Sequence, residues 1–283
     1  MLNEYYTLAN NVLIPKIGLG TWMVEDEDAE QVVASAIEAG YRHIDTAQAY
    51  ENEAGVGRGI KAGSVPRDQL FITTKLAAEA KSYDEAKKAI DESLAKLDLD
   101  YIDMMIIHSP QPWANFGDDD RYFEGNLEAW KALEEAYKDG KLRAIGLSNF
   151  KQQDIQNILD NCTVKPLVNQ VLAHASNTPF ELIEFVQKQE MLVEAYSPVG
   201  HGELFKNDEI KALADKYGVS VPQLAIRYDL QLGLLPLPKS TNPEHMKNNA
   251  DVDFIISDED METLKNLPTI EDYGDASDMP VFQ

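Results

Sequence analysis

The stretch Ile17-Gly-Leu-Gly-Thr-Trp22 decides which α/β architecture the chain adopts. Ile17–Gly20 reads as a short strand, and a helical pattern follows it. An open, doubly wound sheet usually carries G-x-G-x-x-G directly after its first strand, and this stretch does not match that motif. Gly55, Gly57 and Gly59 do not match it either, because their spacing is wrong and they lie inside a helical pattern. The open sheet is therefore disfavoured.

Seven further strand candidates follow, separated by longer helical patterns. They lie at Arg42–Asp45, Leu70–Lys75, Ile102–His108, Ala144–Ser148, Leu167–Gln170, Leu192–Tyr196 and Leu234–Leu237, after a turn-rich opening segment from Leu8 to Pro15. Alternating strands and helices indicate a parallel sheet, and eight such strands close a barrel. We predict an α/β fold in which residues 1–283 form one domain, a (β/α)8 TIM barrel with a short N-terminal β-hairpin and a C-terminal loop.

Helix-start signals agree with this alternation. Ser82-Tyr-Asp-Glu85 reads as a capping box, in which each end residue bonds the backbone N–H of the other. Ser220-Val-Pro-Gln223 opens another helix, which Gly233 ends. Asn242-Pro243 combines a capping side chain with a proline suited to a first turn, so it predicts the start of a further helix.

The composition excludes several classes of function. The chain has 49 acidic and 25 basic side chains, and its formal net charge of −24 argues against nucleic acid or an anionic membrane surface as a partner. The single cysteine, Cys162, excludes an intrachain disulfide and a cysteine-rich metal site, and it fits a reducing cytoplasm. The N-terminus lacks a signal-peptide pattern, and the longest apolar runs have only strand length. We expect a cytoplasmic protein without a metal ion.

Polar or aromatic residues stand at the carboxyl ends of most predicted strands, where a barrel of this type places its active site. In chain order they are Asp45, Lys75, His108, Ser148 with Asn149, Gln170, Tyr196 and Lys239. Each alone is a weak signal, because a histidine there is more often structural and a tyrosine is usually packing. Since a barrel brings these positions to one rim, their convergence predicts a site.

Four of these positions can form an acid system that reduces a carbonyl group. Tyrosine has a pKa of about 10, so Tyr50 alone exchanges protons poorly. A neighbouring ammonium from Lys75 lowers that pKa, and Asp45 keeps the lysine charged and oriented. His108 can hydrogen-bond the substrate oxygen. The alternative reading is a buried Asp–Lys ion pair that only stabilises the barrel interior.

The motifs around these residues resemble the aldo-keto reductase family, in particular bacterial 2,5-diketo-gluconate and aldehyde reductases. Asp45-Thr-Ala-Gln-Ala-Tyr-Glu-Asn-Glu53 with Val56-Gly57 is similar to the family signature around its catalytic Asp and Tyr. Further matches occur in family order at Ile17–Trp22, Ile72–Lys75, Tyr101–His108, Ile145–Phe150, Asn169-Gln170, Ala195–Pro198 and Leu237–Ser240. The similarity spans roughly residues 5 to 270.

The resemblance implies an NADPH-dependent oxidoreductase that converts an aldehyde or ketone to an alcohol by hydride transfer from the nicotinamide. It makes Tyr50 the general acid, assisted by Lys75 and Asp45, with His108 orienting the carbonyl. The substrate would contact Trp22, Tyr50, His108 and Trp113. Further candidates for the pocket wall are Phe116, Tyr122 and the tail residues Tyr273, Met279 and Phe282, which either line the pocket or pack on its rim.

The resemblance also implies an extended dinucleotide site without a Rossmann motif. Ser148, Asn149 and Gln170 would bond the carboxamide, Tyr196 would stack on the nicotinamide ring, and the loop 197–202 would cover the pyrophosphate. The full set comprises Gly20, Thr21, Trp22, Ser148, Asn149, Gln170, Tyr196, Ser197, Val199, Gly200, Lys239, Ser240, Thr241, His245, Asn248 and Asn249.

Lys239 and Ser240 occupy the family's 2′-phosphate positions, next to a helix N-terminus whose amides attract anions. His245 stands where many members carry an arginine, four residues before Asn249, and Asn248 replaces a frequent glutamate. A neutral imidazole adds no charge, so we expect a weaker preference for NADPH than usual, with NADH possible but weaker.

Other departures concern the stretch after Gln170, where Leu172 and Ala173 replace a frequent Glu-Tyr pair. His43, His174 and His201 are interpreted as structural residues. Asp118-Asp-Asp120 is interpreted as a solvated acidic loop.

Two questions stay open at this stage. Some relatives of the fold act as binding or structural subunits, but the complete set of four catalytic positions argues against that role here. Keto-sugars, methylglyoxal or other aldehydes, and simple ketones are all candidate substrates. We expect a small-molecule carbonyl substrate, no nucleic-acid or membrane partner, and a monomer.

Overall fold

A closed barrel of parallel strands forms the centre of the computed structural model, which describes residues 1–282. Its eight strands follow one another around the wall: β3 (Leu19–Gly20), β4 (His43–Asp45), β5 (Phe71–Leu76), β6 (Ile102–Ile107), β7 (Leu142–Ser148), β8 (Val168–Leu172), β9 (Leu192–Tyr196) and β10 (Leu235–Leu237). Backbone bonds from Gly18 N to Pro236 O (3.2 Å) and from Gly20 N to Pro238 O (3.0 Å) join the last strand to the first. The predicted TIM barrel is confirmed.

All eight predicted strands are present, with ends that differ by at most two residues from the predicted ones. β3 is the shortest, because Ile17 and Gly18 run beside the last strand without pairing with β4. Gly18 permits a close approach there, since a Cβ atom would lie only 2.6 Å from Nδ1 of His43.

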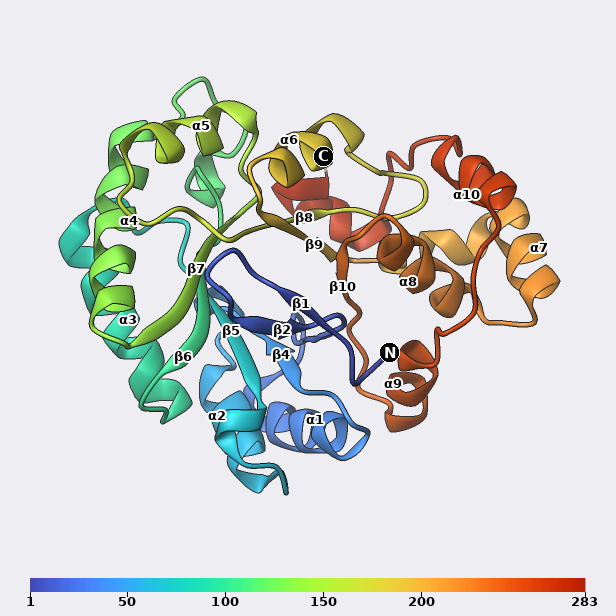
Figure 1. Ribbon diagram of the computed structural model, residues 1–283, viewed down its shortest axis with the longest axis horizontal. Coiled ribbons are helices and arrows are strands. Elements are labelled where there is room, and N and C mark those ends of the chain that lie inside the picture. The colour runs from blue at the N-terminus through green and yellow to red at the C-terminus, as the bar shows by residue number, and fades with distance from the viewer. Residues whose placement is uncertain (283) are drawn as a thin grey trace.

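An N-terminal hairpin covers one end of the barrel. Its strands β1 (Tyr5–Thr7) and β2 (Leu13–Pro15) pair antiparallel and lie across the centre of the ring in Figure 1. Leu8 and Ile14 pack with residues of the barrel interior, and the Tyr6 hydroxyl donates to Leu234 O at 3.0 Å, just before β10. The predicted hairpin therefore closes the amino ends of the strands and leaves the carboxyl ends for a site.

Helices surround the barrel in a ring (Figure 1). They are α1 (Asp26–Glu38), α2 (Glu53–Ala62), α3 (Tyr83–Leu97), α4 (Phe123–Lys138), α5 (Gln152–Asn161), α6 (Phe180–Lys188), α7 (Asp208–Tyr217), α8 (Val221–Gln231), α9 (Pro243–Ala250) and α10 (Asp258–Lys265). Short 3-10 turns are η1 (Gln48–Tyr50), η2 (Arg67–Gln69), η3 (Trp113–Asn115), η4 (Gly200–Lys206), η5 (Gly274–Asp278) and η6 (Pro280–Phe282). Within residues 1–282, each helix is too short or too polar to cross a membrane.

The predicted helix starts are confirmed by their caps. Ser220 and Gln223 form a reciprocal capping box at the start of α8, and Gly233 turns the chain toward β10 with a φ of 77°. The Asn242 side chain accepts a hydrogen bond from Glu244 N (2.9 Å) at the start of α9. Ser82 caps α3 by accepting from the N–H of Glu85, but Glu85 Oε2 accepts from Lys81 N (3.2 Å) instead of Ser82 N, so only one half of the predicted capping box forms.

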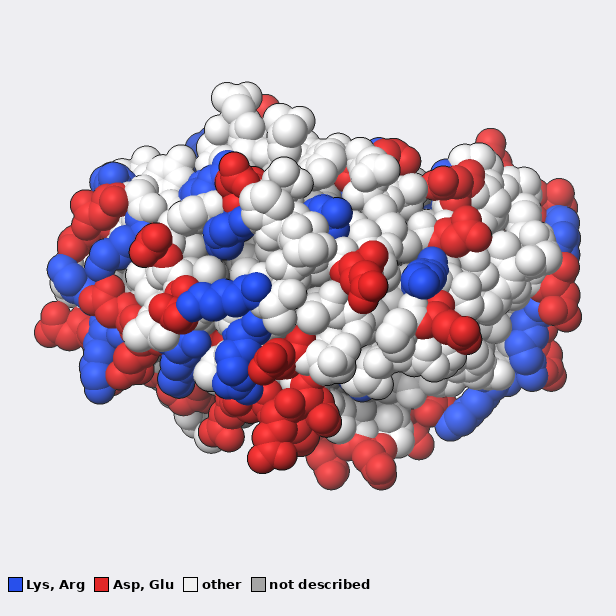
Figure 2. Space-filling view, turned by 90° about the horizontal axis from the view of Figure 1, so that it is seen from below, with Lys and Arg blue, Asp and Glu red and all other residues white. Residues whose placement is uncertain are grey.

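The surface carries the acidic excess of the sequence. Figure 2 shows acidic side chains gathered along the lower edge of one side of the molecule, with basic side chains between them on the left. Most ion pairs in the described chain lie at this kind of exposed position, where each is worth about 0–1 kcal/mol. Asp45, Asp103 and Asp154 differ, because their carboxylates are buried in ion pairs with Lys75, with Arg67 and Arg143, and with Arg121, respectively. Asp45 and Asp154 lie at or just after the carboxyl ends of barrel strands.

Candidate active site

A cavity of about 510 Å³ opens at the carboxyl ends of the strands. This volume lies within the range of small-molecule sites. Its lining contains most of the residues that the strand ends predict: Gly20, Thr21, Trp22, Asp45, Tyr50, His108, Trp113, Ser148, Asn149, Gln170, Tyr196, Ser197, Val199 and Lys239. The sequence therefore identified the correct end of the barrel and most of the wall of its cavity.

The turn that carries Tyr50 is fixed by two amide side chains, the buried Asn52 and the partly buried Gln48. Asn52 donates to the backbone oxygens of Thr21 (2.9 Å) and Val24 (2.8 Å), and it accepts from the Thr46 hydroxyl at 2.6 Å. Gln48 donates to Ala89 O on α3 at 2.8 Å. The chain between β4 and α2 is thus held at both ends of η1, which orients the Tyr50 ring toward the cavity.

Lys75 links Tyr50 to Asp45 below the cavity. Its ammonium forms an ion pair with Asp45 and donates to Tyr50 Oη at 3.1 Å and to Thr46 O at 3.1 Å. Lys75 is only 1% exposed, so this charge is neutralised by its protein partners rather than by water. A lysine so placed can stabilise a negative charge that develops on the tyrosine oxygen.

Burial and charge act in opposite directions on this cluster. Burial raises the pKa of Tyr50 and outweighs Lys75, which lowers it. The lysine thus lowers the pKa as expected, but burial has the larger effect, so the phenol is protonated at neutral pH. Burial disfavours the charged form of Lys75, but the interactions with Asp45 and Tyr50 outweigh burial and raise the pKa of Lys75. The cluster thus combines a protonated tyrosine with a stable ammonium.

His108 reaches the cavity as a neutral imidazole. Burial, and secondarily the charge of Lys75, holds its pKa well below the usual value. Its ring lies edge-on to Tyr50, with 5.7 Å between ring centroids, and edge-on to Trp113 at 5.0 Å. A neutral imidazole has one N–H, so it can donate a hydrogen bond to a substrate oxygen without adding a charge.

Behind Gln170 lies an acid that sequence reasoning missed. Gln170 Nε2 donates to Asp45 Oδ2 at 2.9 Å and to Glu194 Oε2 at 2.8 Å. Glu194 is fully buried on β9, and burial, with a further contribution from Asp45, raises its pKa to about 8. The available sequence signal was a single acid within the apolar strand Leu-Val-Glu-Ala-Tyr196. Parallel strands that are covered on both faces rarely contain an acid.

The predicted carboxamide-binding groups already bond one another. Asn149 donates to His108 O at 3.0 Å and accepts from the Tyr196 hydroxyl at 2.8 Å, while Ser148 Oγ donates to Gln170 O at 2.9 Å. Asn149 has a φ of 61°, a left-handed conformation that asparagine tolerates well. These bonds fix the orientation of the Tyr196 ring at the cavity wall.

The predicted phosphate-binding residues lie at and beyond the rim. Lys239 is exposed and lines the cavity, whereas Thr241, His245 and Asn248 are exposed around α9 outside it. The first turn of α9 also contains the exposed acid Glu244. Of the remaining predicted positions, Ser240 is partly buried beside Lys239 and Asn249 is buried. The positive charge at this end is therefore limited.

An aromatic cluster closes one side of the cavity. The Phe282 ring stacks on Trp22 with 6.0 Å between centroids, and it lies edge-on to His201 at 4.6 Å. Met279, Val281 and Phe282 line the cavity, which answers the open question about the tail. Tyr273 instead packs behind the wall and bonds His174 Nε2 at 3.0 Å. The C-terminal segment thus contributes apolar surface to the pocket.

The rings of His43, His174 and His201 each bond a hydroxyl group, as their structural interpretation predicts, although His201 also lines the cavity. His43 Nε2 lies 2.9 Å from Thr73 Oγ1, and His201 Nε2 lies 3.0 Å from Ser197 Oγ.

Tyr122 does not appear in the cavity wall formed by residues 1–282, and Phe116 only packs against Trp113, with 5.9 Å between ring centroids. Of the four aromatic candidates in the loops after the first and fourth barrel strands, Trp22 and Trp113 line the cavity.

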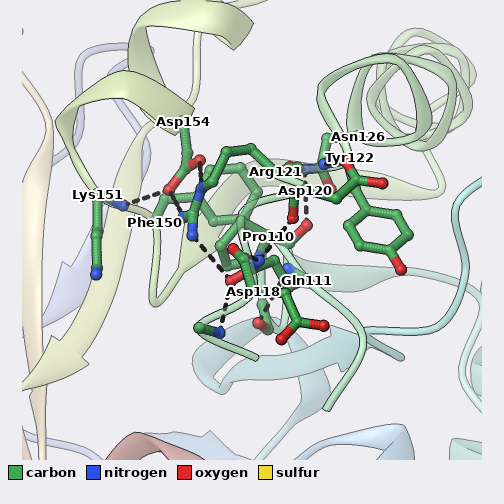
Figure 3. A network of polar contacts seen from close by, with 12 residues as sticks. Pro110, Gln111, Asp118, Asp120, Arg121, Tyr122, Asn126, Phe150, Lys151 and Asp154 are labelled. Atoms are coloured by element: carbon green, nitrogen blue, oxygen red, sulfur yellow. Dashed lines mark hydrogen bonds and ion pairs between the residues drawn. The ribbon is translucent and has the colours of Figure 1, made fainter. Parts of the chain in front are cut away.

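The loop that carries Trp113 is held by a buried polar network (Figure 3). Arg121 forms an ion pair with Asp154 at the start of α5 and donates to Gln111 Oε1 at 2.8 Å. Gln111 in turn donates to Asp118 O (2.8 Å) and Asp120 O (2.6 Å). Asp118-Asp-Asp120 has exposed side chains, as the solvated-loop interpretation predicts, while its backbone completes the network. The loop is therefore anchored to the barrel.

Comparisons with known proteins agree with this geometry. The model of the Aldo/keto reductase family matches residues 16–268. Glyoxal reductase of Bacillus subtilis is 40% identical over 283 residues, covering 99% of each chain. A solved aldo-keto reductase from a Medee basin deep-sea metagenome library has a TM-score of 0.87 and 36% identity over 93% of this chain and 95% of that one. A Bombyx mori aldo-keto reductase in complex with NADP has a TM-score of 0.86 and 34% identity, covering 97% and 96%.

Proposed function

Because the chain belongs to the aldo/keto reductase family, and is an NAD(P)H-dependent oxidoreductase that acts on carbonyl groups, we propose that Tyr50 is its general acid. The observation that carries this proposal is the contact between Tyr50 Oη and the ammonium of Lys75, at 3.1 Å on the cavity floor. Few arrangements let a tyrosine release a proton near neutral pH, and a buried cation beside the oxygen is one of them.

The residues of the cavity fit a nicotinamide dinucleotide. Bound there, the reduced cofactor would supply a hydride to the carbonyl carbon. Tyr196 offers an aromatic face for the nicotinamide, and Ser148, Asn149 and Gln170 supply polar groups beside it. Both N–H groups of the Gln170 amide point to carboxyl groups, so its amide oxygen is the atom that would accept from a carboxamide. The loop 197–202 would lie over the pyrophosphate.

The proton step follows from the cluster. The Tyr50 hydroxyl gives its proton to the carbonyl oxygen as that oxygen gains electron density, and the charge left on the phenol is stabilised by Lys75. Asp45 keeps the lysine charged and in place. His108 donates its single N–H to the same carbonyl oxygen and thereby orients the substrate. The apolar wall formed by Trp22, Trp113 and Phe282 excludes water from the reacting atoms.

We further propose that NADPH is the better cofactor but that its advantage is small. Lys239 supplies a positive charge near the N-terminus of α9, which favours a 2′-phosphate. His245 adds no charge when neutral, and Glu244 in the same turn repels an anion. The net attraction is weaker than that of a site with an additional arginine, so NADH binds as well.

Small aldehydes and dicarbonyls are the proposed substrates. The Bacillus subtilis relative is named for glyoxal, and the cavity wall here is predominantly apolar around Tyr50 and His108. The proposed working unit is a monomer of one domain, because one chain supplies the complete cavity. The single cysteine, Cys162, is unpaired and supports a reducing compartment such as the cytoplasm.

Turnover on a carbonyl panel tests the proposed reaction. Glyoxal, methylglyoxal, an aromatic aldehyde, a keto-sugar and a simple ketone would each be incubated with NADPH and with NADH, and cofactor oxidation followed by absorbance. We expect turnover with the small aldehydes and a modest NADPH advantage. Cofactor binding without oxidation on every substrate and at every pH would instead favour a binding or sensing role.

A further inference from the structure

Glu194 is a buried acid that the proposed reaction does not use. It lies on β9 with no exposed surface and does not line the cavity. One nitrogen, Gln170 Nε2, donates to both Glu194 Oε2 (2.8 Å) and Asp45 Oδ2 (2.9 Å). Gln170 therefore connects Glu194 to the carboxylate that pairs with Lys75.

The surroundings of Glu194 disfavour its charged form. Its second oxygen, Oε1, has no hydrogen-bond partner in the described part of the chain. The charged groups that act on it are Asp45 on β4 and Lys75 on β5, and Lys75 is already paired with Asp45. Gln170 on β8 is neutral, and Leu235 on β10, which pairs with Glu194 in the sheet, is apolar. Burial and Asp45 raise the pKa of Glu194 to about 8, so the group is un-ionised at neutral pH.

We propose that un-ionised Glu194 is a positioning residue, which holds the Gln170 amide against Asp45 and leaves the charge of Lys75 available to Tyr50. This inference rests on the proposed role of Tyr50 as proton donor. Both donors of the Gln170 amide are directed at carboxyl groups, so its oxygen is presented to the ligand in one fixed orientation. With Glu194 neutral, the net charge of Asp45 and Lys75 together is zero before the proton leaves Tyr50.

Ionisation of Glu194 would change this balance. A second carboxylate bonded to the same Gln170 nitrogen adds a negative charge beside Asp45, and this charge opposes the one that develops on the tyrosine oxygen. An uncompensated charge so close in a protein interior alters the rate on the order of tenfold. The proton-transfer step should therefore slow as the pH rises through the pKa of Glu194, about 8.

The first test compares single-turnover reduction rates of the wild type and two isosteric variants at pH of about 7 and about 9.5, with saturating NADPH and aldehyde. Glu194→Gln cannot ionise, so we expect its rate ratio between the two pH values to change by less than about threefold, against about tenfold for the wild type. Asp229→Asn is the matched control, because Asp229 is also a fully buried acid, but it lies on α8 outside the cavity and its carboxyl oxygens have no hydrogen-bond partner within residues 1–282. Its rate ratio should equal that of the wild type. Equal alkaline losses in the wild type and Glu194→Gln would overturn the proposal.

The second test measures positioning without catalysis. Glu194→Leu removes the acceptor of the Gln170 N–H, whereas Glu194→Gln keeps an oxygen there. We expect NADPH affinity, measured by fluorescence titration, to fall about tenfold in the leucine variant and to be largely rescued by glutamine. Equal affinities of the two variants would overturn the positioning role.

The third test detects the proton on the Glu194 carboxyl group directly. Infrared difference spectra of the cofactor-free wild type with labelled glutamate should contain an un-ionised carboxyl band at pH about 7 that disappears as the pH passes about 8. Absence of that band at pH about 7 would overturn the proposal, even if a variant failed to fold. This readout involves no turnover, so a wrong assignment of Tyr50 would leave it unchanged and would appear separately, as full activity of Tyr50→Phe.

Discussion

Replacing Lys75 by methionine removes the positive charge that the mechanism needs beside Tyr50. Lys75 Nζ lies 3.1 Å from Tyr50 Oη. At an effective dielectric constant of about 20, a full pair of charges at that separation is worth about 5 kcal/mol. If about half of the charge has developed on the phenol oxygen in the transition state, the loss is about 2–3 kcal/mol, or roughly 10²-fold in the rate of reduction.

The same substitution also leaves Asp45 as a buried charge without its ammonium. Removing one partner of a buried pair costs about 3–5 kcal/mol of folding free energy. The double variant Asp45→Asn/Lys75→Met removes that orphaned charge as well. We expect it to recover much of the stability but none of the rate, because the tyrosine still lacks a cation. This difference separates a catalytic effect from a folding effect.

The assay is stopped-flow NADPH oxidation in a single turnover with saturating aldehyde, accompanied by urea unfolding of each variant. Lys87→Met is the matched control, because Lys87 also contacts a tyrosine hydroxyl (Tyr83, 3.3 Å) and pairs with an acid, Glu135, but on the surface. It should leave the rate unchanged. A Lys75→Met rate within about threefold of the wild type, or a double variant with restored rate, would refute the reasoning.

Three further predictions follow from the same structure. Lys239→Ala should weaken NADPH binding about tenfold and NADH binding less than twofold in fluorescence titrations, and equal losses would exclude a phosphate contact. Arg121→Met should raise the aldehyde KM several-fold with little change in cofactor affinity, because it frees the loop of Trp113 from Asp154; a double-mutant cycle with Asp154→Asn should show coupling. Burial raises the pKa of Asp229 in the folded protein well above its value in the unfolded chain. The folded protein is therefore most stable at acid pH, where Asp229 is protonated in both states, and it loses stability as the pH rises toward the folded-state pKa. Asp229→Asn should therefore gain stability relative to the wild type between pH about 5 and about 8 in urea unfolding, and a constant difference would argue against a buried neutral acid.

The barrel could be predicted because its signals are local. Each strand is a short apolar run, several helices begin with a recognisable cap such as Ser220 or Asn242, and the alternation of strands and helices determines the topology. The convergence of Asp45, Lys75 and His108 followed from that topology alone, since parallel strands end at one rim. The strand ends were less certain because bonds to a neighbouring strand, as at Gly18, determine them.

The sequence could not predict features that depend on long-range contacts. Arg121 and Asp154 are 33 positions apart, and nothing local distinguishes their pair from solvated charges. Phe282 lies far in sequence from Trp22, so its stacking in the cavity became visible only in three dimensions. The net pKa direction of Tyr50 also depended on burial, which no spacing reveals. Glu194 was overlooked because its partners Gln170 and Asp45 lie on other strands, so its role depends on contacts that the local sequence does not show.

The most direct test of the central claim is the rate of hydride transfer in Tyr50→Phe at saturating NADPH and aldehyde, with the cofactor dissociation constant measured on the same sample. The substitution removes one hydroxyl and leaves Lys75 bonded to Asp45 and to Thr46 O, so folding and cofactor binding should persist. We predict an unchanged dissociation constant and a rate reduced about 10²–10⁴-fold, the usual worth of a general acid. A rate equal to that of the wild type would mean that the carbonyl oxygen receives its proton from another group.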